Sequence, residues 1–205
     1  MNRSKSSNRW MQEHFDDNYV KMAQAQGYRS RAVFKLSEIQ EKDQIIKSGM
    51  NIIDLGAAPG GWSQFARPLI GKKNKLVALD ILPMDPIEGV DFIQGDFREE
   101  AVLEQLYSLL DGAPINLVMS DMAPNMSGNK EVDQPRAIYL GELAFETAKA
   151  VLTKEGSFLV KLFHGEGFEA FHREVQQSFA KVVIRKPKAS RPRSNEVYIL
   201  AKGFK

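Results

Sequence analysis

Six ionisable side chains stand where apolar runs of this 205-residue chain begin or end. They are Asp54, Asp80, Asp96, Asp121, Lys161 and Glu196. Strands buried on both faces can present such charges only at a rim of their sheet. In an open parallel sheet, ligands bind outside the carboxyl ends of the strands, and an antiparallel last strand brings its first residue to that same rim. One such charge is more often a solvated strand end, but six together favour a single crevice.

A glycine-rich loop adjoins the first of these charges. Residues 52–62 read Ile-Ile-Asp-Leu-Gly-Ala-Ala-Pro-Gly-Gly-Trp, which predicts a short buried strand, a loop with little side-chain bulk and a helix beginning near Trp62. Such a loop lets a ligand approach the backbone close to a helix N-terminus. The spacing Gly-x-x-x-Gly-Gly differs from that of dinucleotide binders, and a tight turn without a ligand is the alternative.

The charges around this loop indicate the kind of ligand. Asp80 ends the second predicted strand, where a carboxylate can accept hydrogen bonds from both hydroxyls of a ribose. Asp96 follows the third strand, and its carboxylate could accept a hydrogen bond from the exocyclic amine of an adenine. The chain has no Gly-x-x-x-x-Gly-Lys-Ser/Thr phosphate loop. We therefore expect a nucleoside with little negative charge, and S-adenosylmethionine fits because its sulfonium is cationic.

The hydrophobic pattern predicts the elements that position these residues. Helices are expected at 30–46, 63–70, 99–110, 134–152 and 168–179, and strands at 52–53, 75–80, 90–94, 115–120, 157–161, 181–185 and 196–201. Ser30 is the expected N-cap of the first helix and Gly49 its stop. The alternation predicts an α/β fold, an open and mostly parallel sheet with helices on both faces. The last two strands have no helix between them, so we expect an antiparallel hairpin at one edge.

Composition narrows the class of protein. The chain has no cysteine, which excludes disulfides and thiolate chemistry and favours an intracellular compartment. The N-terminus lacks the apolar core of a secretory signal, and no run approaches the roughly 18 apolar residues of a spanning helix. We expect a cytoplasmic protein without membrane association.

Charge is unevenly distributed along the chain. Residues 1–35 hold seven Lys/Arg against three Asp/Glu, and residues 181–205 hold eight against one, whereas residues 36–180 hold thirteen against twenty-two. Surface charges usually mean only that the exposed faces of a protein carry solvated residues of both signs. A separation this clear instead favours a polyanionic partner, nucleic acid, held by both ends. Part of residues 1–27 is expected to order only on binding.

Several motifs resemble one family. Asp-Leu-Gly-Ala-Ala-Pro-Gly-Gly-Trp-Ser-Gln, Ser-Asp-Met-Ala-Pro-Asn-Met-Ser-Gly, Val-Lys-Leu-Phe and Ser-Arg-x-Arg-Ser-x-Glu-x-Tyr resemble the RrmJ/FtsJ ribosomal RNA 2′-O-methyltransferases. The likeness runs from Arg-Ser-Arg-Ala-x-Phe-Lys at 29–35 to residue 198. It implies a Rossmann-like class I S-adenosylmethionine-dependent methyltransferase fold with a seven-stranded sheet. It also implies a basic N-terminal extension at 1–29 followed by one methyltransferase domain at 30–205.

The resemblance also implies an active site. The family's Lys-Asp-Lys-Glu tetrad falls on Lys35, Asp121, Lys161 and Glu196, although spacing alone makes Lys35 a solvated surface lysine. His164 stands where glutamine is expected and receives no role. The expected cofactor contacts are Asp54, Gly56, Gly60, Trp62, Asp80, Asp96 and Asp121. The implied reaction is methyl transfer from S-adenosylmethionine to the ribose 2′-hydroxyl of a uridine in 23S ribosomal RNA of the large subunit.

The implied mechanism makes Lys161 the candidate proton acceptor, oriented by Asp121 and Glu196, with alignment supplying much of the rate. The chemistry needs no metal, and no His/Asp cluster has ligand spacing; a monomer is expected. The RNA would be held by basic residues at both ends of the chain, which include Arg29, Arg31, Lys186, Lys188, Arg191 and Arg193.

Three alternatives stay open. Alternating strands alone would permit a nicotinamide-dependent oxidoreductase, although its glycine spacing is absent. A non-catalytic RNA-binding module with a methyltransferase-like fold is the second, and the intact tetrad argues against it. A methyltransferase acting on small molecules or proteins is the third, and it would leave the basic ends unexplained.

Overall fold

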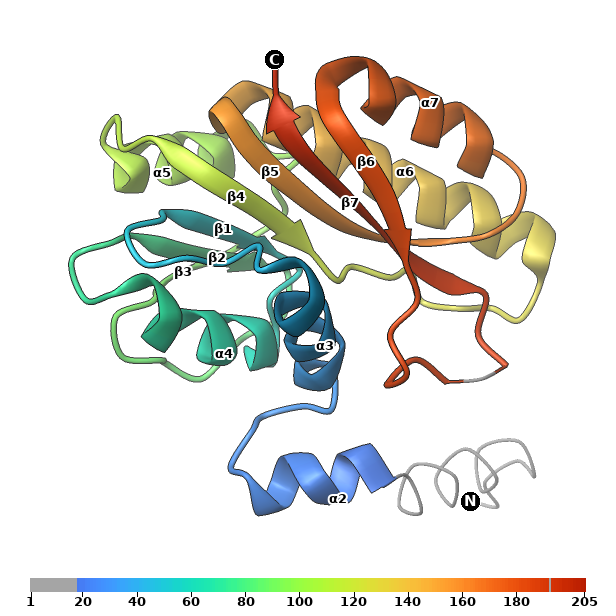
Figure 1. Cartoon of the computed structure of the whole chain (residues 1–205), viewed down its shortest axis with the longest axis horizontal. Coiled ribbons are helices and arrows are strands. Elements are labelled where there is room, and N and C mark those ends of the chain that lie inside the picture. The colour runs from blue at the N-terminus through green and yellow to red at the C-terminus, as the bar shows by residue number, and fades with distance from the viewer. Residues whose placement is uncertain (1–17, 192) are drawn as a thin grey trace.

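Seven strands form one sheet, in the order β3-β2-β1-β4-β5-β7-β6, in a computed structural model that describes residues 18–191 and 193–205 (Figure 1). The strands are β1 (Ile52–Leu55), β2 (Leu76–Asp80), β3 (Asp91–Gln94), β4 (Ile115–Ser120), β5 (Leu152–Phe163), β6 (Phe179–Arg185) and β7 (Glu196–Phe204). Strands β1 to β5 pair in parallel, and β7 is antiparallel to both of its neighbours. The predicted α/β fold with a mostly parallel sheet is confirmed.

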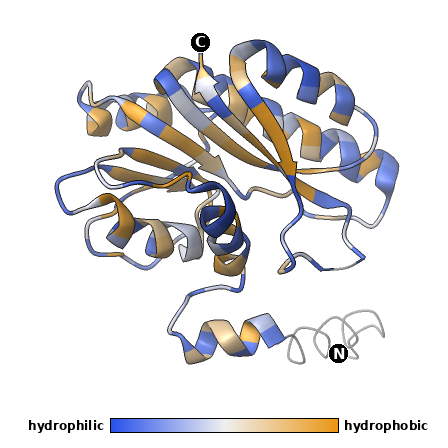
Figure 2. Ribbon diagram, in the orientation of Figure 1, coloured by the Kyte–Doolittle hydropathy of each residue, from blue (hydrophilic) through white to orange (hydrophobic). Residues whose placement is uncertain are grey.

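Helices cover both faces of this sheet. They are α3 (Val33–Asp43), α4 (Gly61–Ile70), α5 (Glu100–Leu110), α6 (Lys130–Val151) and α7 (Phe168–Ser178), whereas α2 (Asn18–Ala25) lies away from the sheet (Figure 1). Successive residues of a strand point to opposite faces. Accordingly Ile52 packs with the apolar residues of α3 and α4, and Ile53 packs with those of α5, α6 and α7. Figure 2 shows strands that are mostly hydrophobic, and helices such as α3 and α7 that carry many hydrophilic residues.

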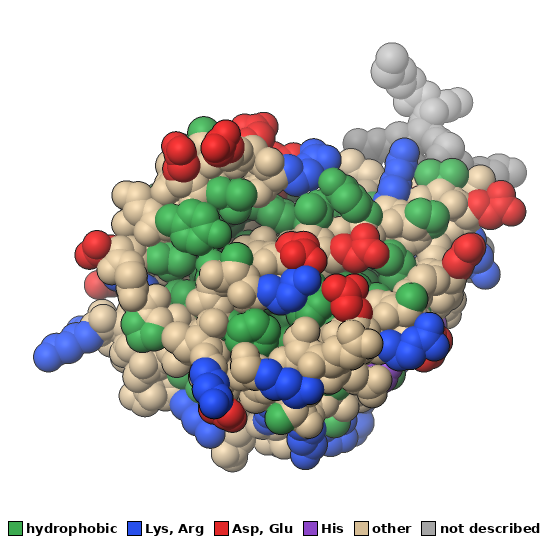
Figure 3. Space-filling view, turned by 90° about the horizontal axis from the view of Figure 1, so that it is seen from above, with side chains coloured by type: hydrophobic (Ala, Val, Ile, Leu, Met, Phe, Trp, Pro, Cys, Tyr) green, Lys and Arg blue, Asp and Glu red, His purple; other side chains and the backbone are tan. Residues whose placement is uncertain are grey.

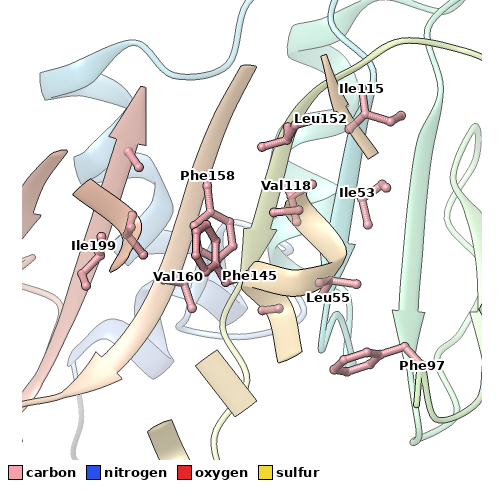
Figure 4. Packing of buried hydrophobic residues seen from close by; sticks show 14 of the residues in the cluster. Ile53, Leu55, Phe97, Ile115, Val118, Phe145, Leu152, Phe158, Val160 and Ile199 are labelled. Carbon is pink, nitrogen blue, oxygen red and sulfur yellow. The ribbon is translucent and has the colours of Figure 1, made fainter. Parts of the chain in front are cut away.

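An aromatic cluster anchors the larger of the two core layers. Phe145 of α6 lies with its ring centroid 5.6 Å from that of Phe158 in β5, and Figure 4 shows this pair beside Val118 and Val160. Phe171 of α7 meets the same Phe145 ring edge-on. This packing fixes α6 and α7 against β4 and β5, the two strands whose ends carry Asp121 and Lys161.

The predicted terminal hairpin is present, but its inner strand is the last one. Strand β7 lies between β5 and β6, so β6 is the edge strand. Residue Lys161 of β5 is therefore the direct cross-strand partner of Tyr198 in β7, and Phe163 is the partner of Glu196. The reversal of β7 brings its first residue to the carboxyl end of β5.

The first predicted helix is shorter than expected. Helix α3 begins at Val33 after Ala32, so the prediction of Ser30 as its N-cap is wrong; the Ser30 hydroxyl instead packs against Gly61. The helix ends at Asp43 with Gln44 in the left-handed region, so Gly49 is not its stop. The physical reason is Gln40, whose side-chain amide bonds both the N–H and the carbonyl of Ile46 at 2.8 Å and turns the chain away.

The starts of α6 and β5 are among the other boundaries that differ from the predictions. Helix α6 starts at residue 130 rather than 134, because the Asn129 side chain accepts the N–H of Glu131 at 3.0 Å and caps it. Strand β5 starts at residue 152, directly after α6, with an irregular register before it pairs evenly with β4. The loop predicted over 122–128 is confirmed. Residues 1–17, which include most of the segment expected to order on binding, lie outside the described residues.

Candidate active site

Four charged side chains, from α3, β5, β7 and the loop after β4, meet beside the carboxyl ends of β4 and β5. Lys161 Nζ lies 3.1 Å from Asp121 Oδ1 and also donates to the backbone carbonyl of Asp121. Lys35 Nζ of α3 lies 2.7 Å from Glu196 Oε1 at the start of β7. The structure thus brings all four tetrad residues together, and Lys35 is not a solvated surface lysine, since its side chain is only 12% exposed.

Tyr198, for which no role was predicted from the sequence, lies between the two ion pairs and contacts both. Its hydroxyl donates to Asp121 Oδ1 at 2.6 Å, while Lys35 Nζ lies 5.8 Å from the centre of its ring. The ring is fully buried and lies 5.8 Å from that of Trp62. The available signal was its spacing: Tyr198 follows Glu196 by two residues in a strand, so both side chains point to the same face.

Burial and pairing have opposite effects on the two carboxylates. Burial alone would raise the pKa of Asp121, but Lys161, Lys35 and the Tyr198 hydroxyl together hold it below its ordinary value. Burial likewise acts to raise the pKa of Glu196, but Lys35, together with Ser190 and Lys161, holds this pKa below its ordinary value. Burial and the neighbouring Asp121 raise the pKa of Tyr198 well above its usual value, so its hydroxyl stays a hydrogen-bond donor. Both carboxylates are ionised at neutral pH and face two lysines.

A cavity of about 480 Å³ opens on the other side of Asp121. Four of the seven predicted cofactor contacts line it, namely Gly56, Asp80, Asp96 and Asp121. Residues 122–125 of the loop after β4 form part of its wall. That loop is held by Asp133 of α6, whose carboxylate accepts the backbone N–H groups of Ser127 and Gly128 at 2.8 and 2.9 Å. Asp121 therefore belongs both to the cavity and to the lysine cluster.

The two other acidic residues at the cavity already have partners. Each carboxylate oxygen of Asp80 accepts one backbone N–H, from Ala58 at 2.9 Å and from Leu82 at 2.8 Å. An ionised carboxylate has about four lone-pair sites, so acceptor capacity remains. Asp96 is paired with Arg98, which donates its backbone N–H at 3.0 Å and its guanidinium; this bonding lowers the Asp96 pKa.

Gly56 and Gly60 serve different purposes. At Gly56, with φ of 74°, an added Cβ would lie 2.2 Å from Met122 Cγ, so glycine here lets the loop after β4 approach β1 at the cavity wall. At Gly60, with φ of 104°, a Cβ would lie 2.8 Å from Met84 and Ile87, which are packing neighbours. Gly60 does not line the cavity.

Trp62 and Asp54 lie behind the glycine loop and do not line the cavity either. Trp62 is 3% exposed, and its indole N–H donates to the carbonyl of Ala32 at 2.9 Å, which ties α4 to the start of α3. Asp54 is 1% exposed and accepts the hydroxyl of Ser63 at 2.6 Å. Burial raises the pKa of Asp54 to about 7, with smaller contributions from the nearby Asp121 and Asp80 carboxylates.

The basic residues predicted to hold RNA are used in two ways. Arg29 donates to the carbonyls of Asp85 at 2.5 Å and Pro86 at 2.7 Å, and Arg31 donates to that of Ala189, so both guanidinium groups fasten backbone segments. By contrast, Lys188 and Arg193 are exposed. On the face in Figure 3, Lys and Arg side chains lie along the lower margin, and acidic side chains lie together with a Lys or Arg side chain near the middle.

Neither a membrane-spanning helix nor a metal-binding cluster occurs among the described residues. Between residues 18 and 205, residue 192 aside, no helix has the length and apolar character needed to cross a bilayer. Over the same residues, no three His, Asp or Glu side chains gather in a way that could hold a metal ion.

Solved structures of other proteins share this architecture. A Plasmodium falciparum protein described as a ribosomal RNA methyltransferase is 30% identical, over 86% of this chain and 98% of that chain, with a TM-score of 0.77. A Clostridium thermocellum protein described as an rRNA-methylase shares the fold at 17% identity, over 82% of this chain and 97% of its own, with a TM-score of 0.56. Residues 28–204 match the FtsJ-like methyltransferase model, and the chain belongs to that family. The resemblance drawn from the motifs is confirmed at the level of the family.

The buried Asp54 carboxyl makes a testable contribution to pH-dependent stability. Its folded pKa of about 7 lies above the unfolded value of ~3.9, so the unfolded state releases its proton first. The contribution of Asp54 to wild-type stability should therefore fall as pH rises between these values, by up to about 1.4 kcal/mol per pH unit. Asp54→Asn keeps an acceptor for Ser63 and removes the titration. In urea denaturation, the variant should gain stability relative to wild type between about pH 4 and 7, and no further above it.

A substitution at Ser63 provides the control for loss of the hydrogen bond. Ser63→Ala removes the hydrogen bond but leaves the carboxyl, so its pH profile should keep the wild-type slope or steepen. A constant stability difference between Asp54→Asn and wild type across this pH range would contradict the raised pKa.

Proposed function

We propose that the protein methylates the ribose 2′-hydroxyl of a uridine in 23S ribosomal RNA, in the large ribosomal subunit. The observation that carries this proposal is Asp121, which lines the acidic cavity and also holds Lys161 in place. A methyl donor in the cavity and a ribose beside Lys161 would then be neighbours. The ribosomal RNA methyltransferase with 30% identity supports RNA as the substrate class.

The cavity suits S-adenosylmethionine, the cofactor that the family implies. Its volume lies within the ~300–1,000 Å³ of small-molecule sites. Its acidic residues suit a cation, and no phosphate loop is present. Asp80 would accept hydrogen bonds from the ribose hydroxyls. Asp96 would accept a hydrogen bond from the adenine amine, which would compete for it with Arg98. When bound, S-adenosylmethionine supplies an electrophilic methyl group.

The tetrad would act on the incoming ribose. A free hydroxyl is a weak nucleophile, and it needs a proton acceptor and orientation. Lys161 is the proposed acceptor, and its bonds to the carboxylate and the carbonyl of Asp121 restrict where its amine can lie. The pair of Lys35 and Glu196 would form the opposite wall for the sugar. Alignment of the two reactants can supply ~7–11 kcal/mol of the barrier reduction.

RNA binding is assigned mainly to the basic segment between β6 and β7. Phosphate contacts from exposed Lys188 and Arg193 would give affinity that falls steeply with salt and carries little sequence information. The reactive 2′-hydroxyl restricts the reaction to RNA. The monomeric state, the cytoplasmic location and the domain boundary near residue 30 stay predictions.

The direct test of this function is methylation in vitro with radiolabelled methyl donor. Free 23S RNA and intact large subunits lacking the modification would be compared, and the modified ribose mapped. Methylation of a single uridine ribose is expected. RNA binding without any transfer would favour the non-catalytic module, and transfer to protein or to a base would refute the proposed acceptor.

Removing the Lys161 amine should separate chemistry from cofactor binding. We expect Lys161→Ala to lower single-turnover methyl transfer by at least about a hundredfold, because the acceptor and its alignment are lost. The dissociation constant of S-adenosylmethionine, measured by calorimetry, should stay near that of wild type, since Lys161 does not line the cavity. Lys154→Ala, an exposed position of the same strand, is the matched control. Affinity and turnover that fall in proportion would make Lys161 a cofactor ligand instead.

Asp80 should show the opposite behaviour. Asp80→Ala removes a carboxylate that lines the cavity and also holds Ala58 and Leu82, so we expect S-adenosylmethionine to bind at least about tenfold more weakly. Asp80→Asn, which keeps one acceptor oxygen, should lose less. The exposed Asp85→Ala provides the control. Unchanged calorimetric affinity in Asp80→Ala would remove this residue from the cofactor site.

A further inference from the structure

Helix α3 is hydrogen-bonded to a segment that lies 150 residues further along the chain. The carboxylate of Glu38 accepts the backbone N–H of Lys188 at 2.7 Å on one oxygen and that of Ala189 at 2.8 Å on the other. Both residues belong to the basic connector, residues 186–195, which joins β6 to β7. Hydrogen bonds to an ionised acceptor are roughly twice as strong as neutral ones, so this is a firm attachment for a loop.

The same helix face also carries a tetrad residue. Glu38 follows Lys35 by three positions, which places the two side chains as neighbours along the helix. Lys35 holds Glu196, the residue directly after the connector, at 2.7 Å. Helix α3 therefore holds the connector in its middle through Glu38 and at its end through Lys35.

Further hydrogen bonds hold the connector on both sides of these two attachments. The Arg31 guanidinium donates to the carbonyl of Ala189, so both backbone groups of that residue are held. At the other end, Lys186 Nζ donates to the carbonyl of Glu196 at 2.9 Å, and the Glu196 N–H donates to Ser194 Oγ at 3.1 Å. A displacement of the connector at residues 188–189 would therefore be transmitted to Glu196.

We propose that Glu38 is a positioning residue. Through the backbone of Lys188 and Ala189 it fixes the basic connector against α3, and so holds Glu196 opposite Lys35 and the exposed connector cations at the RNA-binding edge of the site. This role rests on the proposed function. It assigns no contact between Glu38 and the reacting atoms.

The predicted effect of Glu38→Ala is specific. Without its anchor the connector should sample other positions, so we expect the KM for ribosomal RNA to rise and kcat to fall, each by about tenfold. The dissociation constant of S-adenosylmethionine should be unchanged, because neither α3 nor the connector lines the cavity. Glu38→Gln keeps one acceptor oxygen for the two N–H groups and should recover part of both parameters. Glu41→Ala, an exposed glutamate of the same helix, should behave as wild type.

A second measurement reports the attachment without any reaction. Amide hydrogen exchange at Lys188 and Ala189 should be faster in Glu38→Ala than in Glu41→Ala, and intermediate in Glu38→Gln. Unchanged exchange at these amides would overturn the proposal. Faster exchange with unaltered kcat and KM would also overturn it, by leaving Glu38 only a structural bond. Absence of transfer in the wild-type protein would instead refute the proposed function, whereas active wild type with Glu38→Ala equal to Glu41→Ala would refute only the positioning role.

Discussion

Charge neutrality in a buried site is the constraint on which this structure depends. Lys161 and Glu196 are each 9% exposed, and a charge removed from water is tolerated only when it is paired and hydrogen-bonded. Here two lysines face two carboxylates, and the fully buried Tyr198 bonds Asp121 while its ring lies beside Lys35. These groups come from α3, from the residue after β4, from β5 and from β7, so all of these parts must be placed correctly at the same time.

The sheet topology meets this requirement. A reversed strand between β5 and β6 sets Tyr198 directly opposite Lys161 and places Glu196 two residues away on the same face. Helix α3 then needs only to pack beside β7 for Lys35 to complete the cluster. On the far side of Asp121, the lack of a side chain at Gly56 lets Met122 approach closely, so that the loop after β4 forms part of the cavity wall. One carboxylate is thus shared by the cavity and the lysines.

Sequence predicts much of this arrangement because apolar runs mark buried strands and their ends mark a rim. Of the six charges expected at one crevice, Asp80, Asp96 and Asp121 line the cavity, and Lys161 and Glu196 belong to the adjoining lysine cluster. Asp54 does not join them, because it is buried behind the glycine loop and bonded to Ser63. Helical spacing gave the wrong environment for Lys35, because its burial depends on Glu196, 161 positions away. Similarly, Gly60 is enclosed by Met84 and Ile87, and Trp62 by Tyr198, neighbours that no local pattern reveals. The Asp96–Arg98 pair is local, but it is visible only once both side chains have coordinates.

The buried charges of the site are expected to act as one unit, and a double-mutant cycle on Lys35 and Glu196 tests this most directly. Single-turnover methyl transfer would be measured for Lys35→Met, Glu196→Gln and the double variant. If the pair works as a unit, the double variant should be about as slow as the slower single variant, since either change already breaks the pair. Independent effects that multiply in the double variant would contradict the central claim.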